Sequence, residues 1–329
     1  MGKKVNVLDL FCGAGGMSQG FKSEGFNILL GIDFNKSAIN TFSKNHKESK
    51  TLCEDLTKVS KKQIIKEIGN KKIDVIVGGP PCQGFSMAGK RIPSDPRNSL
   101  FKEYLRVVKE FKPKIFVMEN VRGLLSMKDE KSKKVIDIIL NEFKKIKEYN
   151  VNCYSINTAD YGLPQTRPRI FIIGVKKKYQ YTFPSPTHSR ILNKKNSLKK
   201  WNTIKNIILH KDKIPQKYFY SKRLIDGFRR REIKNKLRGI GFGWKFLDMD
   251  KPSSTISARY WKDGAEALIK YNDKEIRKLT PKECALIQTF PKKFKFLGNE
   301  REVYQQIGNA VPVMMAKVIA KSIKSLFSI

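Results

Sequence analysis

The sequence predicts an α/β fold in which a parallel sheet built from βαβ units is accompanied by a smaller, basic domain. Up to about residue 175, short apolar runs rich in β-branched residues alternate with segments of helical periodicity. Beyond that point the alternation fades, and residues 176–238 contain 20 lysines and arginines but only three acidic residues. A chain of 329 residues, 40% of them hydrophobic, is long enough to bury two cores.

The strands and helices are predicted from the spacing of apolar residues. The strands are expected at Val5 to Leu10, Asn27 to Ile32, Ile73 to Val77, Lys114 to Met118 and Ile170 to Val175. Apolar residues at helical spacing predict helices over 100–111 and 135–146. Thr280-Pro281-Lys282-Glu283 has the residues of a helix N-terminus, and residues 312–326 predict a closing helix.

The charge balance indicates the kind of partner. A formal net charge of +37 and an isoelectric point near 10.0 favour a polyanion. A lysine-rich composition produced by an A·T-rich genome is the alternative explanation, and composition does not separate DNA from RNA. There is no apolar run of signal-peptide length and no stretch near the roughly 18 apolar residues that span a bilayer. A cytoplasmic protein is therefore expected.

The five cysteines are widely spaced, and no Cys-x-x-Cys pattern occurs among them. Neither a disulfide framework nor a zinc site is predicted, and no metal is expected. Any cysteine chemistry would therefore use a free thiol.

A first candidate site follows the first predicted strand. Phe11-Cys12-Gly13-Ala14-Gly15-Gly16 is a glycine-rich turn that lets a ligand approach the backbone closely. Asp33 ends the next strand, where a carboxylate can bind ribose hydroxyls, and Phe34 beside it can cover an adenine ring. This pattern predicts a nucleoside site, although an NAD-binding unit shares it and a tight turn without a ligand is the structural alternative.

A second candidate site is centred on Cys82, within Gly78-Gly79-Pro80-Pro81-Cys82-Gln83-Gly84-Phe85-Ser86. A free cysteine is usually an inert small hydrophobe, but a rigid Pro-Pro turn at a strand end favours a nucleophile. Glu119 ends another strand, and an arginine pair precedes a further strand. In a parallel sheet these groups are expected to converge on Cys82. An acid and a guanidinium beside a thiol suit attack on a pyrimidine ring.

Together these motifs resemble the cytosine-C5 DNA methyltransferases of bacterial restriction-modification systems. The resemblance extends over nearly the whole chain, with six motifs in the order of the family. They are Asp9-Leu10-Phe11-Cys12-Gly13-Ala14-Gly15-Gly16, Pro80-Pro81-Cys82-Gln83, Glu119-Asn120-Val121, Gln165-Thr166-Arg167-Pro168-Arg169, Arg277-Lys278-Leu279-Thr280-Pro281-Lys282-Glu283 and Gly308-Asn309-Ala310-Val311-Pro312.

The resemblance implies roles for individual residues. Cys82 would attack C6 of a cytosine flipped out of the duplex, and Glu119 would contact its N3 and exocyclic amine. Arg167, with Arg169 in the same catalytic set, would hold the base and its O2. S-adenosylmethionine is the implied cofactor. Its expected binding residues are Phe11, Gly13, Gly15, Asp33, Phe34, Asp55, Pro80, Asn309 and Val311.

The resemblance also implies a domain organisation and a partner. A Rossmann-like, S-adenosylmethionine-dependent catalytic domain is expected at residues 1–184 plus 300–329, and a target-recognition domain with a supporting segment at 185–299. Double-stranded DNA is the expected partner of a monomer, and a cognate restriction endonuclease would act on the same site. The candidate DNA contacts are Lys90, Arg91, Arg229, Arg230, Arg259 and Tyr260.

Three other functions remain open at this point. An RNA cytosine methyltransferase acting on tRNA would use the same scaffold, but the long basic segment favours DNA. A catalytically silent DNA-binding regulator would not need Cys82, Glu119 and Arg167 together. An NAD-dependent dehydrogenase agrees only with the first 33 residues.

Two departures from the family pattern are visible. Asp33 stands where many members carry glutamate. The run Ala285-Leu286-Ile287-Gln288-Thr289-Phe290-Pro291 stands where members show an arginine followed by Gln-Gly-Phe-Pro.

Overall fold

The computed structural model describes residues 4–81, 100–129, 132–191, 197–239 and 244–327. The chain divides into two compact units: unit 1 comprises Met1–Asn157, Pro168–Ser185 and Val311–Ile329, and unit 2 comprises Thr158–Arg167 and Pro186–Ala310. Two segments expected in the catalytic domain, residues 158–167 and 300–310, therefore group with unit 2. The buried hydrogen bonds of Arg167, described below, join these two segments to the rest of unit 2.

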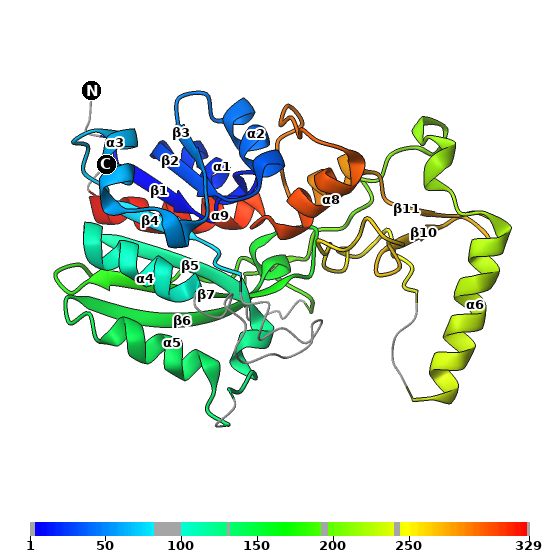
Figure 1. The fold of residues 1–329 in the computed structure, drawn as a ribbon. Helices are drawn as coiled ribbons and strands as arrows, with labels where there is room; N and C mark the ends of the chain where they lie inside the picture. Colours follow the sequence, from blue (N-terminus) through cyan, green and yellow to red (C-terminus); the bar gives the residue numbers. More distant parts are fainter. Residues whose placement is uncertain (1–3, 82–99, 130–131, 192–196, 240–243, 328–329) are drawn as a thin grey trace. The chain divides into compact units, whose positions relative to one another are not determined.

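Unit 1 contains a sheet of seven described strands in the order β3-β2-β1-β4-β5-β7-β6 (Figure 1). Neighbouring strands are parallel from β3 to β5. Central strands β1, β4 and β5 are almost wholly buried because both faces are covered, which agrees with their nearly continuous apolar sequences. The strands are β1 (Asn6–Leu10), β2 (Asn27–Asp33), β3 (Lys50–Cys53), β4 (Val75–Gly78), β5 (Ile115–Val121), β6 (Tyr149–Asn157) and β7 (Pro168–Lys176).

The expectation of a wholly parallel sheet is wrong at β7, which runs antiparallel to both β5 and β6. The start of β7 therefore lies beside the end of β5, with Arg169 opposite Val121. Strands β3 and β6 were not predicted. Their sequences mix polar and apolar residues, and both are only partly buried, so neither has the apolar run that marks the central strands.

Helices cover the sheet of unit 1, and the closing helix predicted over 312–326 is α9. Figure 1 shows α9, in red, beside α1, in blue. The two helices are so close that a Cβ added to Gly20 would lie 2.5 Å from the Ala316 Cβ. The helices of this unit are α1 (Gly16–Ser23), α2 (Lys36–Asn45), α3 (Lys61–Ile68), α4 (Leu100–Phe111), α5 (Val135–Lys144) and α9 (Val313–Lys324), with 3-10 turns η1 (Leu56–Lys58), η4 (Arg122–Leu125) and η8 (Ser325–Phe327).

Unit 2 has a core of its own, centred on Ile256, Tyr260 and Ile307. The predicted helix start at Thr280 is confirmed, since Thr280 and Glu283 form a reciprocal capping box at the start of α7. Its elements are α6 (Lys222–Leu237), α7 (Pro281–Ile287), α8 (Glu300–Asn309), β8 (His188–Ser189), β9 (Lys199–Lys200), β10 (Leu268–Lys270) and β11 (Ile276–Lys278), with 3-10 turns η5 (Thr158–Tyr161), η6 (Lys211–Lys213) and η7 (Gln216–Tyr218).

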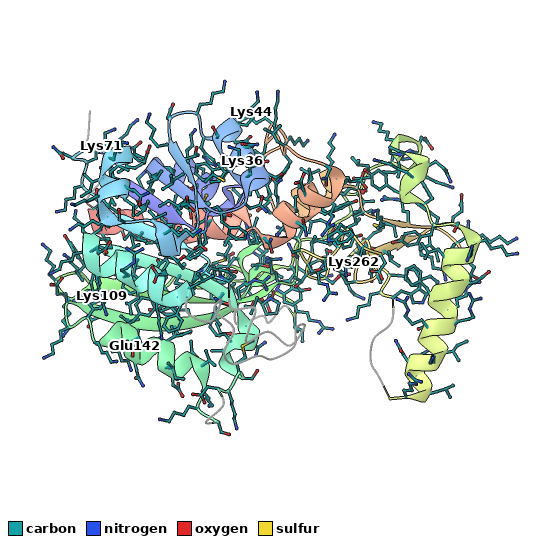
Figure 2. The ribbon with its side chains drawn as sticks, viewed as in Figure 1. Lys36, Lys44, Lys71, Lys109, Glu142 and Lys262 are labelled. Atoms are coloured by element: carbon teal, nitrogen blue, oxygen red, sulfur yellow. The ribbon has the colours of Figure 1, made fainter. Side chains whose placement is uncertain are left out.

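The excess of lysines is spread over the surface of unit 1 as well as unit 2. Figure 2 labels Lys36 and Lys44 on α2, Lys71 and Lys109, all of which are exposed. Positive charge alone therefore does not mark a binding surface in this protein. In the described part of the chain, no helix combines the length and the apolar character needed to cross a membrane.

Candidate functional site

The carboxyl ends of β1, β2, β4 and β5 meet at one edge of the sheet. From β1 the chain continues to β2 on one side, whereas β4 pairs with β1 on the other side. Such a switch point at the carboxyl edge is where α/β sheets bind ligands. The backbones are close here, because a Cβ added to Gly78 would lie 2.3 Å from the Leu10 carbonyl oxygen.

The glycine-rich turn after β1 has an unusual backbone. Phe11, Gly13 and Gly15 all have left-handed φ angles, of 56°, 53° and 90°. A non-glycine residue such as Phe11 holds this conformation only at a cost, and such strained residues cluster at ligand sites. A Cβ added to Gly13 would meet no atom within 4 Å, whereas at Gly15 it would lie 2.6 Å from the buried His46 side chain. The turn therefore packs against His46 at Gly15, whereas space remains beside Gly13.

Asp33, Phe34 and Asp55 complete this part of the edge. The Asp33 carboxylate accepts hydrogen bonds from the backbone N–H groups of Gly13 (2.9 Å) and Asn35 (2.8 Å). Burial raises the pKa of Asp33, although these backbone hydrogen bonds oppose the rise. Phe34 is 68% exposed, the highest exposure among the aromatic residues of this part of the edge, so its ring is accessible to a ligand. Asp55 caps η1 just after β3, the strand that pairs with β2.

This arrangement fits the expected nucleoside-bearing cofactor. A bound ligand would cover the open space at Gly13 and the exposed ring of Phe34. Asp33 provides a carboxylate at the end of β2, next to Phe34 in the chain. Asp55 lies at the end of the neighbouring strand. Val311 is buried in unit 1, and Asn309 is exposed in unit 2.

The turn that leads toward the predicted nucleophile is fixed from β5. The Asn120 side-chain amide, itself buried, donates a hydrogen bond of 3.0 Å to the carbonyl oxygen of buried Pro80. Cys82 lies outside the described residues, as do Lys90 and Arg91. In the sequence, Asn120 stands out only as part of the Glu119-Asn120-Val121 motif. Its bond to Pro80 could not be predicted from the sequence, because the two residues are 40 positions apart.

A buried ion pair lies at the same edge. Arg169 Nε is 2.9 Å from Glu119 Oε1, and both side chains are nearly inaccessible to solvent. The other Glu119 oxygen, Oε2, would lie 3.3 Å from a Cβ placed on Gly79, so the carboxylate faces the turn before Cys82. Burial lowers the pKa of Arg169, and the negative charge of Glu119 opposes that change. Among the described residues no acceptor contacts Arg169 Nη2, so the guanidinium keeps donors for a ligand.

Arg167 has different surroundings, and they disagree with the expected role in holding the base. Its guanidinium is 2% exposed and donates to the backbone carbonyls of Ile256 (2.8 Å), Gly308 (2.8 Å) and Ala310 (3.1 Å), all in unit 2. Three carbonyls converge on one cation, which is the environment of a structural clamp. Of the two arginines in the expected catalytic set, Arg167 is thus bound to backbone carbonyls, whereas Arg169 pairs with Glu119 at the sheet edge.

Of the described residues expected to contact nucleic acid, one is buried and three are exposed. Tyr260 is fully buried, and its hydroxyl donates to Ala267 O (2.6 Å) and accepts from Leu279 N–H (2.8 Å). It is a core residue of unit 2, so the expected contact to DNA is wrong. Arg229, Arg230 and Arg259 are exposed, as expected of groups that meet a polyanion.

Comparison with known proteins gives consistent results. The profile of the family described as C-5 cytosine-specific DNA methylase matches residues 5–325. The type II methyltransferase M1.HphI of Haemophilus parahaemolyticus is 37% identical, with 97% of this chain and 86% of that protein covered. The type II methyltransferase M1.ScrFI of Lactococcus lactis subsp. cremoris is 34% identical, with 97% and 77% covered.

Among solved structures, the S. pombe Dnmt2 methyltransferase superposes with a TM-score of 0.74 at 17% sequence identity, with 98% of this chain and 99% of that chain covered. At this identity the likeness concerns the fold, and it agrees with the seven-stranded sheet of unit 1.

Proposed function

The chain belongs to the C-5 cytosine-specific DNA methylase family, and on that premise we propose how its own residues act. It is a DNA (cytosine-5-)-methyltransferase that uses S-adenosylmethionine. We propose that Cys82 is the nucleophile, that Glu119 acts on the ring nitrogen side of cytosine, and that Arg169 holds the base. The observation that carries this assignment is the buried Glu119–Arg169 ion pair, which faces the turn that precedes Cys82.

The first proposed step is addition of the Cys82 thiolate to C6 of the target cytosine. The sulfur forms a bond to C6, and the π electrons of the C5–C6 bond make C5 nucleophilic. When bound, S-adenosylmethionine supplies an electrophilic methyl group. After methylation, loss of the C5 proton restores the double bond and releases Cys82 as a thiolate. Asn120 acts as a positioning residue, because its bond to Pro80 fixes the chain two residues before the nucleophile.

Glu119 and Arg169 divide the recognition of the ring between them. The Glu119 carboxylate can accept a hydrogen bond from the exocyclic amine and, when protonated, donate to N3, which lowers the barrier to thiolate addition. Arg169 can donate from Nη2 to the carbonyl O2 while Nε remains on Glu119. The two side chains are then pre-oriented by each other before the base arrives.

The cofactor is proposed to lie along the turn after β1. Gly13 and the strained Phe11 would leave room for its amino-acid portion, Asp33 would bind the ribose hydroxyls, and Phe34 would cover the adenine ring. Asp33 is already held by two backbone N–H groups, so its position does not depend on the ligand. Asp55 would approach the adenine amine from the end of β3, and Pro80 and Val311, which also belong to unit 1, remain part of the proposed pocket.

The proposed substrate is a short site in duplex DNA. The target base must leave the stack for Cys82 to reach C6, which costs on the order of a few kcal/mol. The relatives named above are type II methyltransferases. We propose that this enzyme likewise protects its site from a cognate restriction endonuclease and acts as a monomer, because each turnover modifies one flipped base.

The proposal is tested by transfer of a tritiated methyl group from S-adenosylmethionine to mixed-sequence duplex DNA and, in parallel, to tRNA. Incorporation at C5 of cytosine in DNA is expected from the wild type, and sequencing the product gives the site. Cys82→Ser should abolish transfer, because a hydroxyl is a far weaker nucleophile than a thiolate. Cys153→Ser, at a half-buried cysteine of β6, is the matched control and should retain activity.

A second readout isolates the covalent step. Duplex DNA containing 5-fluorocytosine at the target should trap the wild type as an adduct that survives denaturing electrophoresis, since fluorine cannot leave C5 as the proton does. Cys82→Ser should form no adduct. Methyl transfer to tRNA alone would show that the substrate is RNA and not DNA. Methyl transfer by Cys82→Ser would show that Cys82 is not the nucleophile.

A further inference from the structure

The proposed function does not say which cationic residues of unit 2 contact DNA. Helix α6 carries many of them. Between Lys222 and Leu237 it has seven cationic and two acidic side chains. Only one side of the helix is packed, through Ile225 (2% exposed) and Phe228 (5% exposed), with Ile225 against the hairpin residues Leu268 and Ile276. Figure 1 shows α6, in yellow-green, as a single long helix near β10 and β11. The cationic side chains of the helix are all exposed, whereas Asp226, Gly227, Glu232 and Asn235 are half-buried.

The cations on α6 differ in whether the protein already neutralises them. Arg229 lies 3.6 Å from Asp226 and donates to Asp273 O at 2.9 Å. Arg231 lies 3.7 Å from Asp263, and Lys236 lies 3.6 Å from Glu232. In the described part of the chain, by contrast, no carboxylate lies within 4.0 Å of Arg223, Arg230 or Lys234.

These three cations share one face of the helix. Their spacings of seven and four residues place them in one row at 3.6 residues per turn. The packed residues Ile225 and Phe228 lie on the opposite side, about half a turn away. The row of Arg223, Gly227, Arg230 and Lys234, here called the outer stripe, therefore points directly away from the core of unit 2.

Gly227 stands within the outer stripe, four residues after Arg223 and three before Arg230. A glycine within an exposed helix costs about 1 kcal/mol relative to alanine. Packing within the described residues does not require it, because an added Cβ would meet no atom within 4 Å. Its presence instead leaves a flat patch of backbone between two arginines, where a partner can approach the helix closely.

We propose that the outer stripe of α6 binds the sugar–phosphate backbone of duplex DNA. The stripe consists of uncompensated cations at intervals of about 6 to 10 Å along the helix, from 1.5 Å per residue, so each cation can reach a different phosphate of the DNA backbone. Arg223 and Arg230 offer planar forks suited to phosphate oxygens. This inference rests on the proposed function, since it assumes that DNA is the substrate, and it assigns these residues to backbone positioning rather than to base recognition.

The test measures binding of full-length protein to a duplex by fluorescence anisotropy over a range of salt concentrations. Arg223→Gln, Arg230→Gln and Lys234→Gln should each weaken binding about three- to tenfold at low salt. Each should also reduce the slope of log affinity against log salt by about 0.9, the value for one lost phosphate contact. Lys236→Gln is the matched control on the same helix, because Glu232 already neutralises Lys236. It should change the affinity less than twofold.

Gly227→Ala tests whether DNA approaches the helix backbone closely, because the variant adds a methyl group without changing any charge. Alanine should preserve or raise the melting temperature, because it favours the helix. The variant should nevertheless bind DNA at least threefold more weakly. Unchanged affinity in Gly227→Ala would disprove the close approach, and an unchanged salt slope in the three cation variants would disprove the stripe as a DNA surface. Methyl transfer by the wild type on the same duplex tests the proposed function separately, so the two failures are distinguishable.

Discussion

At the scale of single residues, Asp9 is a buried acid in the strand that precedes the glycine-rich turn. Asp9 is in β1, 1% exposed, and its Oδ2 accepts a hydrogen bond of 2.6 Å from Ser18 Oγ. Burial raises its pKa from 3.8 to about 7, the nearby charge of Asp33 raises it further, and the bond from Ser18 opposes the change. The folded protein therefore retains a proton on Asp9 well above the pH at which the unfolded chain releases it.

This difference predicts a pH-dependent stability. Because the folded pKa is raised, the contribution of Asp9 is fully present below about pH 4 and is lost as the pH rises through about 7. Between pH 5 and pH 8 the wild type should lose roughly 2 to 3 kcal/mol of unfolding free energy relative to Asp9→Asn, which cannot ionise. Urea denaturation of both proteins at each pH measures this difference.

Ser18→Ala provides the control for that experiment. Removing the hydroxyl removes the hydrogen bond that opposes the raised pKa, so the window of lost stability should move to higher pH. Identical pH profiles for Asp9→Asn and the wild type would contradict the assignment to Asp9.

At the scale of elements, the end of α7 carries a departure from the family pattern. Thr289 stands where the family pattern has glycine, and it has a left-handed φ of 61°. The turn is fixed by hydrogen bonds from Thr289 N–H to Leu286 O and from Phe290 N–H to Ala285 O, both 2.9 Å. A β-branched residue pays a steric cost in this conformation, of about 1 to 2 kcal/mol.

Thr289→Gly is therefore expected to stabilise the protein. The relief of the left-handed strain should exceed the larger conformational entropy that glycine loses on folding. The free energy of unfolding should therefore rise by about 0.5 to 1 kcal/mol and the melting temperature by about 2 °C. Thr289→Ala keeps a Cβ and so keeps most of the strain, which makes it the matched control. A melting temperature of Thr289→Gly below that of Thr289→Ala would show that the turn does not control stability here.

At the scale of the whole molecule, Arg167 decides how the segments of unit 2 are joined. Its guanidinium connects residues 89 to 143 positions away, at Ile256, Gly308 and Ala310. Gln288 adds bonds to Ile307 O (2.6 Å) and Ala310 O (3.1 Å), and it accepts one from Gln165 (2.8 Å). This network explains why residues 158–167 and 300–310 belong to unit 2.

Arg167→Met should accordingly destabilise unit 2 by about 3 kcal/mol, because it leaves several buried carbonyl groups without their donor. Hydrogen exchange should show lost protection in α7 and α8, while the sheet of unit 1 stays protected. Arg169→Met, the control, should abolish methyl transfer but leave protection in unit 2 unchanged. Loss of transfer in Arg167→Met with full protection of α7 and α8 would return the base-holding role to Arg167.

Much of this protein is determined by the sequence itself. Apolar runs and helical spacing are local properties, so β1, β2, β4, β5, α4, α5 and α9 were predicted close to their observed bounds. The residues proposed for the chemistry of the edge could be named from the sequence for a similar reason, because strand ends, glycine turns and a Pro-Pro-Cys segment are formed by consecutive residues. The local sequence around β3 and β6 carries no such pattern, and these strands form only because a neighbouring strand supplies their hydrogen bonds.

Only the tertiary structure decided the direction of β7 and the difference between Arg169, in β7, and Arg167, just before it. Arg167 and Arg169 are two positions apart, and the period of a strand would place both on the same face. The antiparallel pairing with β5 brings Arg169 to Glu119, whereas distant carbonyl groups of unit 2 surround Arg167. Strand direction and long-range hydrogen bonds depend on the whole chain being folded, and for that physical reason no local pattern could have distinguished the two arginines.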